Sequence, residues 1–354
     1  MSAYLNAIGT AVPAHDVHTA FIDWAAGRVA PSRRALFSRM AARAGIAHRW
    51  SVLPRSESGS PTAPGGFYAD DPLPGTGERM QVYAAEAPGL ALAAIATLAT
   101  RIPVDGVTHL IVASCTGFVA PGIDQIIAAR LGLDASVERL LVGFMGCYAA
   151  VSALRSARHI VLSEPDARVL VVTVELSTLH LQAAEEIEPL LAMLQFGDGA
   201  AAALVTAEPA GLALGQPFAT TLADSADLIR WTITDRGFAM HLSGEVPARI
   251  AAALADPALA AAVTGGQGPA SVDGWAVHAG GRSILDAVEQ ALALGPDALA
   301  ASRMVLRDFG NMSSATLMFV LARLLDGPRI ERGVALAFGP GLAAEGLALA
   351  SAGR

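Results

Sequence analysis

The feature that most constrains the fold of this chain is a spacing pattern that occurs twice. In the first half, the apolar stretch THLIVASCTG is typical of a strand, and it ends in a small polar turn at Cys115. Cys147 follows 32 residues later, where an apolar run, a glycine-containing turn and a helical pattern meet. The stretch ARVLVVTVE then ends at Glu175, 28 residues beyond Cys147. The first half therefore predicts strands that alternate with helices, as in α/β proteins.

The second half repeats this spacing with different residues. The stretch VDGWAVHAGG predicts a strand that ends at His278, and Asn311 follows 33 residues later. We expect Asn311 to lie in another strand–turn–helix junction, within MVLRDFGNMSSATLMFVLARLL, and the next strand to end at Gly339. The matched spacing indicates a duplicated unit, with halves 1–210 and 211–354. A pseudo-twofold arrangement would bring both helix starts and His278 together.

Composition excludes several classes of function. Apolar residues make up 53% of the chain and charged residues 16%, and the net charge is −8 with no basic tail, so nucleic-acid binding is not expected. All 24 basic residues are Arg, and the absence of Lys excludes Schiff-base lysine chemistry and a phosphate-binding P-loop. The longest uncharged apolar run, 87–100, is too short to span a bilayer, and no basic residue of a secretory signal precedes Arg28. We expect a cytoplasmic protein.

The two cysteines, Cys115 and Cys147, do not make a metal site or a cytoplasmic disulfide by themselves. Cys147 stands out because it begins a helical pattern beside Gly146. Free N–H groups at a helix start lower the pKa of a thiol, and a sharp glycine turn exposes a nucleophile. A neutral His such as His278 can accept the thiol proton, and Asn311 offers an amide donor toward an oxyanion. These residues predict nucleophilic chemistry without fixing the reaction.

Five ordered stretches together resemble the type III polyketide synthases, the chalcone-synthase-like family. They are GFMGCYAA (143–150), FGDGAAAALV (196–205), VHAGGRSIL (277–285), GNMSSAT (310–316) and FGPGLAAEGLAL (338–349). A sixth stretch, SCTGFVAPGID (114–124), resembles the bacterial branch of the family. The resemblance runs along nearly the whole chain. It implies the thiolase fold, in which duplicated αβαβα halves form five layers, and it implies a homodimer.

The resemblance also implies roles for residues that match the family motifs. Cys147 matches the nucleophile that receives the acyl group, while His278 and Asn311 match the catalytic His and Asn. Phe196 matches an aromatic gatekeeper between the coenzyme A tunnel and the cavity. Met240 falls at the second gatekeeper position, where plant relatives carry Phe, and this implies a softer entrance.

Other positions of the family's cavity and tunnel fall on residues of mixed character. Arg39 and Arg43, four residues apart on one helical stretch, match two basic positions for coenzyme A phosphates, while a third falls on Leu36. Ala120 falls where plant relatives place a Met, and a small residue there implies a side tunnel for a long acyl chain. The positions that line the cavity wall are Cys115, Thr116, Ser177, His180, Trp231 and Ser313.

The implied reaction is an iterative decarboxylative Claisen condensation of malonyl-CoA onto an acyl-CoA starter, bound as a Cys147 thioester, followed by cyclisation. It requires no cofactor beyond the coenzyme A thioesters. We favour a fatty acyl starter and an alkylpyrone or alkylresorcinol product. The alternatives are a malonyl-primed synthase of the tetrahydroxynaphthalene type, a β-ketoacyl synthase of the priming type and a non-catalytic acyl-CoA-binding scaffold. The sequences at 278–281 and 339–341 argue against a priming synthase, and the intact Cys147, His278 and Asn311 argue against a scaffold.

Overall fold

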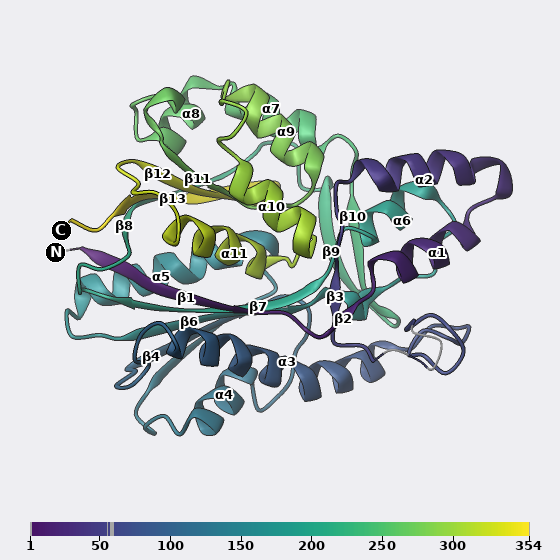
Figure 1. Ribbon diagram of the computed structural model, residues 1–354, viewed down its shortest axis with the longest axis horizontal. Helices are drawn as coiled ribbons and strands as arrows, with labels where there is room; N and C mark the ends of the chain where they lie inside the picture. Colours follow the sequence, from purple (N-terminus) through teal and green to yellow (C-terminus); the bar gives the residue numbers. More distant parts are fainter. Residues whose placement is uncertain (1, 55, 57–59, 354) are drawn as a thin grey trace.

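The computed structural model describes residues 2–54, 56 and 60–353, and Figure 1 shows how they are arranged. The strands are β1 (Ala3–Ala11), β2 (His15–Asp16), β3 (Trp50–Ser51), β4 (His109–Ser114), β5 (Glu138–Gly143), β6 (Val169–Leu176), β7 (Asp198–Thr206), β8 (Leu212–Thr221), β9 (Ile229–Thr234), β10 (Gly237–Leu242), β11 (Gly274–Val277), β12 (Gly333–Gly339) and β13 (Ala343–Ser351). The α-helices are α1 (His18–Arg28), α2 (Arg34–Arg43), α3 (Thr76–Ala99), α4 (Ile123–Leu131), α5 (Ala149–Ser163), α6 (Ile187–Met193), α7 (Val246–Leu254), α8 (Pro257–Thr264), α9 (Arg282–Ala291), α10 (Ala300–Phe309) and α11 (Ser314–Leu325). The 3-10 turns are η1 (Pro31–Arg33), η2 (Gly146–Tyr148), η3 (Ser177–His180) and η4 (Pro269–Ser271).

Nine strands join in one mixed sheet, in the order β11-β12-β13-β8-β1-β7-β6-β4-β5. The sheet consists of two similar parts that meet at β1 and β8, which pair over three residues, Ala3–Leu5 with 212–214. In the first part β4 runs parallel to β6, and β7 and β1 follow antiparallel. In the second part β11 runs parallel to β12, and β13 and β8 follow antiparallel. The repeated order of strand directions confirms the predicted duplication.

The helices occupy three layers, one between the two parts of the sheet and one beyond each part (Figure 1). Helices α5 and α11 lie in the middle, α3 and α4 cover the first part, and α7, α8 and α9 lie beyond the second. Buried apolar side chains form a cluster in each layer, because the helices that cover the sheet turn their apolar faces toward it. These alternating layers confirm the predicted five-layer α/β fold.

Two local predictions differ from the structure. The sequence predicts a strand before Asn311, but the chain forms α10 there, and Asn311 lies in a helix–turn–helix junction. The buried positions of α10, such as Ser302 and Leu306, recur at the spacing of a helix, and this pattern outweighs the apolar run. The strand β5 exists as predicted, but four of its six residues are exposed and Val142 alone is buried. Leu140 and Leu141 are 43% and 41% exposed because β5 is the edge strand of the sheet.

Within the part of the chain that the structure describes, α3 is long and apolar enough to cross a membrane, judged by length and composition alone. In this fold α3 packs along β1, β6 and β7, with Tyr83, Ala91 and Leu98 among its buried residues. Its packing against the sheet accounts for its apolar character, since a helix that covers a sheet needs an apolar face.

A smaller group of elements stands to one side of the layers, at the right of Figure 1. The hairpin β9–β10 pairs Trp231 with Met240, α6 packs against β10, and α2 packs against α6. This group forms one wall of the cavity that holds the candidate site.

Candidate active site

Cys147 lies in a turn whose shape depends on the glycine before it. Gly146 has a φ of 78°, and a Cβ atom there would lie 2.6 Å from Pro340 Cδ, so this position requires glycine. Cys147 follows in the 3-10 turn η2, two residues before α5 begins. The predicted strand–turn–helix junction is therefore present, with the thiol just before the α-helix rather than in its first turn.

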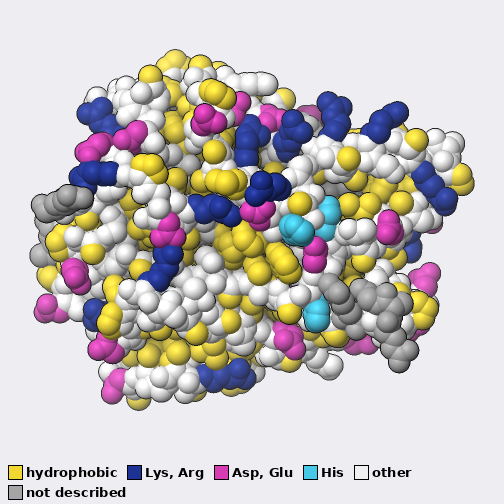
Figure 2. All heavy atoms as spheres, viewed as in Figure 1, with side chains coloured by type: hydrophobic (Ala, Val, Ile, Leu, Met, Phe, Trp, Pro, Cys, Tyr) yellow, Lys and Arg dark blue, Asp and Glu magenta, His cyan; other side chains and the backbone are white. Residues whose placement is uncertain are grey.

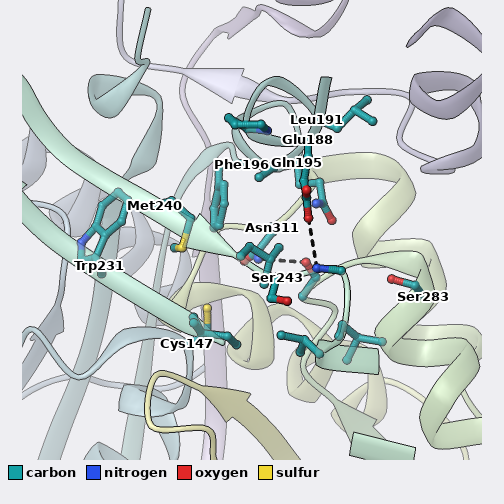
Figure 3. A pocket seen from close by; sticks show the side chains of 18 of the residues that line it. Cys147, Glu188, Leu191, Gln195, Phe196, Trp231, Met240, Ser243, Ser283 and Asn311 are labelled. Atoms are coloured by element: carbon teal, nitrogen blue, oxygen red, sulfur yellow. Dashed lines mark hydrogen bonds between the residues drawn. The ribbon is translucent and has the colours of Figure 1, made fainter. Parts of the chain in front are cut away.

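Cys147, His278 and Asn311 line one cavity of about 830 Å³, part of which Figure 3 shows. They reach it from three junctions: η2, the residue after β11, and the turn between α10 and α11. Asn311 Nδ2 donates to Gly280 O at 3.1 Å, and Asn311 Oδ1 accepts from the Ser313 N–H at 2.8 Å. These two bonds fix the amide plane, and the amide also forms a hydrogen bond with Cys147. The structure thus brings together the three residues that the spacing pattern predicts.

Burial governs the protonation of this site. It raises the pKa of Cys147 to about 12, although hydrogen bonds from Ser313 and Asn311 act in the opposite direction. It also lowers the pKa of His278 to about 3. Both ring nitrogens of His278 are buried without a hydrogen-bond partner among the described residues. The prediction of a lowered thiol pKa is therefore wrong, and the resting site holds a neutral thiol and a neutral imidazole.

A second thiol lies close to the first. Ser313 Oγ is 3.1 Å from Cys115 Sγ and 3.9 Å from Cys147 Sγ, so its hydroxyl links the two cysteines. The buried carboxylate of Glu175 accepts hydrogen bonds from the Cys115 N–H at 3.0 Å and from Thr116 Oγ1 at 2.8 Å. Burial raises the pKa of Glu175 and of Cys115. Cys115 is therefore a protonated residue of the cavity wall, and its backbone is held by the hydrogen bond to Glu175.

The two predicted gatekeepers lie across the cavity from Cys147, as Figure 3 shows for Phe196 and Met240. Phe196 forms a short parallel bridge with Asn311, and the buried Arg49 donates through Nη1 to Phe196 O at 3.2 Å. The backbone of Phe196 is thus held against the segment that carries Asn311.

An aromatic wall of Trp231, His180 and Phe238 stands at one side of the cavity, where Trp231 contributes to the lining. Trp231 Nε1 donates to Cys115 O at 2.8 Å. The Phe238 N–H donates to His180 Nδ1 at 3.0 Å, so His180 Nε2 carries the proton that it shares with Thr116 O at 2.6 Å. The ring of His180 stacks on Phe238 with centroids 4.2 Å apart and meets Trp231 edge-on at 5.3 Å. Burial lowers the pKa of His180 to about 3, so His180 supports the wall as a neutral ring.

Four predicted site residues lie outside the cavity lining, and one of them is His180, which lies behind the wall. Ala120 is exposed between β4 and α4. Arg39 and Arg43 are exposed on α2, and the structure shows no contact of either with the cavity. The remaining predicted wall residue, Ser177, lines the cavity. The residues of the η1–α2 segment that line its mouth are Arg33, Leu36 and Met40.

Two residues of the site are missing from the sequence prediction. Glu175 is a single acidic residue near the end of an otherwise apolar strand, and this is a signal, because a buried carboxylate needs hydrogen-bond donors around it. Phe238 carries no local signal, since it reaches the wall only because β10 folds against η3.

Sequence comparisons agree with this geometry. Two family models match the chain: "Chalcone and stilbene synthases, N-terminal domain" over residues 2–209 and "Chalcone and stilbene synthases, C-terminal domain" over 214–353. The alpha-pyrone synthesis polyketide synthase-like protein Pks18 of Mycobacterium tuberculosis is 34% identical over 249 residues, which are 67% of this chain and 63% of Pks18. The match thus spans less than two thirds of Pks18. Type III polyketide synthase C of Arabidopsis thaliana is 33% identical over 258 residues, 69% of this chain and 67% of that protein.

Solved structures with the same architecture extend the comparison to the whole chain. PKS-I from the brown alga Ectocarpus siliculosus matches with a TM-score of 0.88 at 28% identity, covering 99% of this chain and 98% of that one. The C-terminal type III polyketide synthase domain of Steely1 from Dictyostelium matches with a TM-score of 0.90 and covers 100% of both chains. Its identity is 23%, so this likeness concerns the fold alone.

Proposed function

This chain belongs to the chalcone and stilbene synthase family, and from that membership we propose that it is a type III polyketide synthase, an acyltransferase that extends an acyl-CoA starter with malonyl-CoA. The observation that carries the proposal is the cavity shared by Cys147, His278 and Asn311. A thiol, an imidazole with unpartnered nitrogens and an oriented amide supply the nucleophile, the base and the oxyanion donor that acyl transfer requires.

Loading of the starter begins with a proton transfer. His278 accepts the Cys147 proton through an unpartnered ring nitrogen, and the thiolate attacks the thioester carbonyl of acyl-CoA. The imidazolium and thiolate stabilise each other, which offsets the burial that opposes each charge alone. The carbon–sulfur bond to coenzyme A breaks, and the departing sulfur takes the proton from His278. Cys147 then carries the acyl group as a thioester.

Extension uses the same residues in a second role. Malonyl-CoA loses CO2, and the electron pair of the broken bond forms a thioester enolate. Asn311 Nδ2 and His278 donate hydrogen bonds to the enolate oxygen. The enolate carbon attacks the Cys147 thioester, and Cys147 leaves as a thiolate. We expect no metal ion or further cofactor to be needed, because the loss of CO2 supplies the electron pair of the new carbon–carbon bond.

For the starter we propose a fatty acyl group, with an alkylpyrone or alkylresorcinol as the product. The cavity wall is rich in apolar side chains, including Leu191, Ile229 and Phe338, and burial of each methylene contributes about 0.8 kcal/mol. The printed name of Pks18 refers to alpha-pyrone synthesis, which supports closure to a lactone. Because Ala120 lies outside the lining, the proposed chain occupies the main cavity, up to the aromatic wall.

We also propose halves at 1–210 and 211–354 and a homodimer as the active form. The two family models, which meet between residues 209 and 214, support the division. The exposed Leu140 and Leu141 of the edge strand β5, together with Phe118 at 43% exposure, support the dimer. Exposed apolar edge strands are surfaces that a second copy can cover.

The proposed function is tested by incubation with malonyl-CoA and acyl-CoA starters of about two to about sixteen carbons, a range set by the gain per methylene. We expect pyrones or resorcinols, with kcat/KM rising with starter length until the cavity is full. If malonyl-CoA alone gave a naphthalene product, the starter would be malonyl-CoA and not a fatty acyl group. If the protein bound acyl-CoA but catalysed no condensation, it would not be a polyketide synthase. That result would indicate a non-catalytic acyl-CoA-binding scaffold.

A further inference from the structure

Two arginines of this chain, Arg49 and Arg79, are completely buried. Arginine side chains normally lie at the surface, as Figure 2 shows for one face of the molecule. Arg49 and Arg79 are instead 0% exposed, and neither forms an ion pair with a carboxylate among the residues that the structure describes. A cation buried in this way is costly unless its donors are satisfied. The groups that accept its hydrogen bonds therefore indicate what each arginine holds in place.

Arg49, which lies just before β3, connects the start of α1 to the gate. Its Nε donates to His18 Nδ1 at 3.0 Å, and its Nη2 donates to His18 O at 3.3 Å. The ring of His18 can accept because burial lowers the pKa of His18 to about 4 and keeps the ring neutral. Burial also lowers the pKa of Arg49 to about 9, so the guanidinium still carries its charge at neutral pH. The remaining bond, from Nη1 to Phe196 O at 3.2 Å, thus comes from a cation that α1 holds at two points.

The peptide group that Arg49 binds is also bound to Asn311. The Gly197 N–H donates to Asn311 O at 3.0 Å, and the Asn311 N–H donates to Gln195 O at 2.8 Å. Phe196 O and the Gly197 N–H belong to one planar peptide group, so the two bonds hold its opposite ends. Figure 3 shows Phe196 and Asn311 close together in the cavity that also holds Cys147. A rotation of this peptide group would release the gate and the backbone of Asn311 together.

The aliphatic part of Arg49 packs against the residue just before Asn311. Gly310 has a φ of 68°, and a Cβ atom there would lie 2.9 Å from Arg49 Cγ and 2.7 Å from Gln195 O. The side chain of Arg49 therefore fills the space beside the turn that leads to Asn311, while its guanidinium holds Phe196 O. Arg49 itself does not line the cavity.

We infer that Arg49 is a positioning residue, which fixes the gate at Phe196 and the amide of Asn311 in one relation to each other. This inference rests on the proposed function. The amide plane of Asn311 is set by Gly280 and Ser313, but the backbone from which the amide projects is set by the peptide group that Arg49 holds. A displaced Asn311 would no longer direct its N–H groups to the enolate oxygen.

The two steps of the proposed reaction should depend on Arg49 to different degrees. Decarboxylation uses the amide of Asn311, which lies next to the segment that Arg49 holds. Acyl loading uses the Cys147 thiol and the His278 imidazole, which come from η2 and from the end of β11. Loss of Arg49 should therefore lower the rate of decarboxylation more than the rate of loading. A role in stability alone would lower both rates by the same factor.

The test measures CO2 release from malonyl-CoA and acylation of Cys147 by a fatty acyl-CoA, both at a temperature at which each variant is folded. In Arg49→Met the ratio of decarboxylation to loading is expected to fall at least about tenfold, since a misplacement of about 1 Å can cost about 100-fold in rate. The loss should appear in kcat for CO2 release and not in KM for malonyl-CoA, because Arg49 does not line the cavity. Arg49→Lys should recover part of the ratio, since an ammonium group can bind Phe196 O but lacks the planar fork of Arg49.

A second variant tests the same link without removing the cation. His18→Phe keeps a ring at the start of α1 but removes the acceptor of Arg49 Nε. The ratio of decarboxylation to loading should fall in this variant too, by a smaller factor than in Arg49→Met. If Arg49→Met does not fold, His18→Phe and Arg49→Lys decide the question by the same ratio.

The matched control is Arg79→Met, which also removes a buried guanidinium. Arg79 Nη1 donates to Leu179 O at 2.7 Å and to Leu181 O at 2.8 Å, so it holds a different segment. Arg79→Met should lose stability but keep the ratio of the two rates. A wild-type ratio in Arg49→Lys and His18→Phe, or equal losses of both steps in Arg49→Met, would overturn the role of Arg49 and leave the proposed function intact. A wild-type protein that neither loads acyl-CoA nor releases CO2 would overturn the proposed function itself.

Discussion

His278 and His180 show how hydrogen bonding decides the use of a buried residue. Burial lowers the pKa of each to about 3, so both rings are neutral. The nitrogens of His180 are engaged by Phe238 and Thr116, whereas those of His278 have no partner among the described residues. His180 therefore holds the wall in position, whereas His278 keeps the unpartnered nitrogens that its proposed proton exchange with Cys147 requires.

The proposed roles of His278 and Asn311 predict different defects. His278→Gln should lose acyl loading, because no imidazole remains to take the thiol proton, while its amide can still support some decarboxylation. Asn311→Ala should mainly impair decarboxylation, by about 10²–10³-fold, the usual cost of one oxyanion donor. Acyl-enzyme formation and CO2 release are measured separately. Equal losses of both steps in both variants would refute this division.

The buried His180 should make stability depend on pH. Folding lowers its pKa from 6.5 to about 3, so between these values the unfolded chain binds more protons than the folded one. The contribution of His180 to the free energy of unfolding is therefore fully present above pH 6.5, and it decreases as the pH falls below that value. In His180→Gln the loss of unfolding free energy between pH 7 and pH 5 should shrink by about 2 kcal/mol. Denaturant titrations at both pH values measure this, with the exposed His241→Gln as the control. An unchanged loss would show that His180 protonates freely in the folded protein.

The sequence allows Cys147, His278 and Asn311 to be predicted because each lies in a motif at a junction. The direction of the thiol pKa shift is not predictable in the same way. It depends on burial by segments distant in the sequence, which outweighs the local effect of the helix start.

At the scale of elements, the position of Cys147 depends on the turn between β5 and α5. Gly146 supplies the left-handed backbone and leaves room for Pro340, which belongs to the second half of the chain. The turn could be predicted from its glycines, but the contact with Pro340 could not. The strand predicted before Asn311 failed for a related reason, because a short apolar run does not distinguish a strand from the buried face of α10.

Gly146→Ala should displace the thiol. The new Cβ would lie 2.6 Å from Pro340 Cδ at a φ of 78°, so the turn has to shift. A shift of about 1 Å costs about 100-fold in rate, and the backbone strain costs about 1–3 kcal/mol of stability. Condensation rate and thermal unfolding are both measured. The control is Gly132→Ala, which has a φ of 64° and no atom within 4 Å, and which should lose stability but keep its rate. Equal rates in the two variants would contradict the role of the turn.

At the scale of the whole molecule, the repeated spacing of the sequence corresponds to two similar parts of one sheet. The spacing repeats because the ends of strands in both halves lead to the same cavity, where Cys147 follows β5 and His278 follows β11. The exposure of β5 could not be predicted, since Leu140 and Leu141 look like core residues in the sequence. Which strand lies at the edge is a property of the sheet order, not of the strand.

The proposed dimer can be tested at this edge. Leu140→Asp places a charge on the exposed strand β5 and should shift the protein from dimer to monomer, because a charge in a covered apolar surface is costly. Sedimentation velocity reports the mass. Met304→Asp is the control, since Met304 is 36% exposed on α10, which packs against β11 at the opposite edge of the sheet. A Leu140→Asp protein that sediments like the wild type would exclude β5 from the interface.

The central claim is that the acyl group is carried on Cys147, and mass spectrometry of the protein after incubation with a fatty acyl-CoA tests it most directly. We predict a gain of one acyl mass, located on the peptide that contains Cys147. The adduct should be absent in Cys147→Ala and retained in Cys115→Ser, since Cys115 is a protonated residue of the wall. An adduct on Cys115, or condensation that persists in Cys147→Ala, would contradict the account.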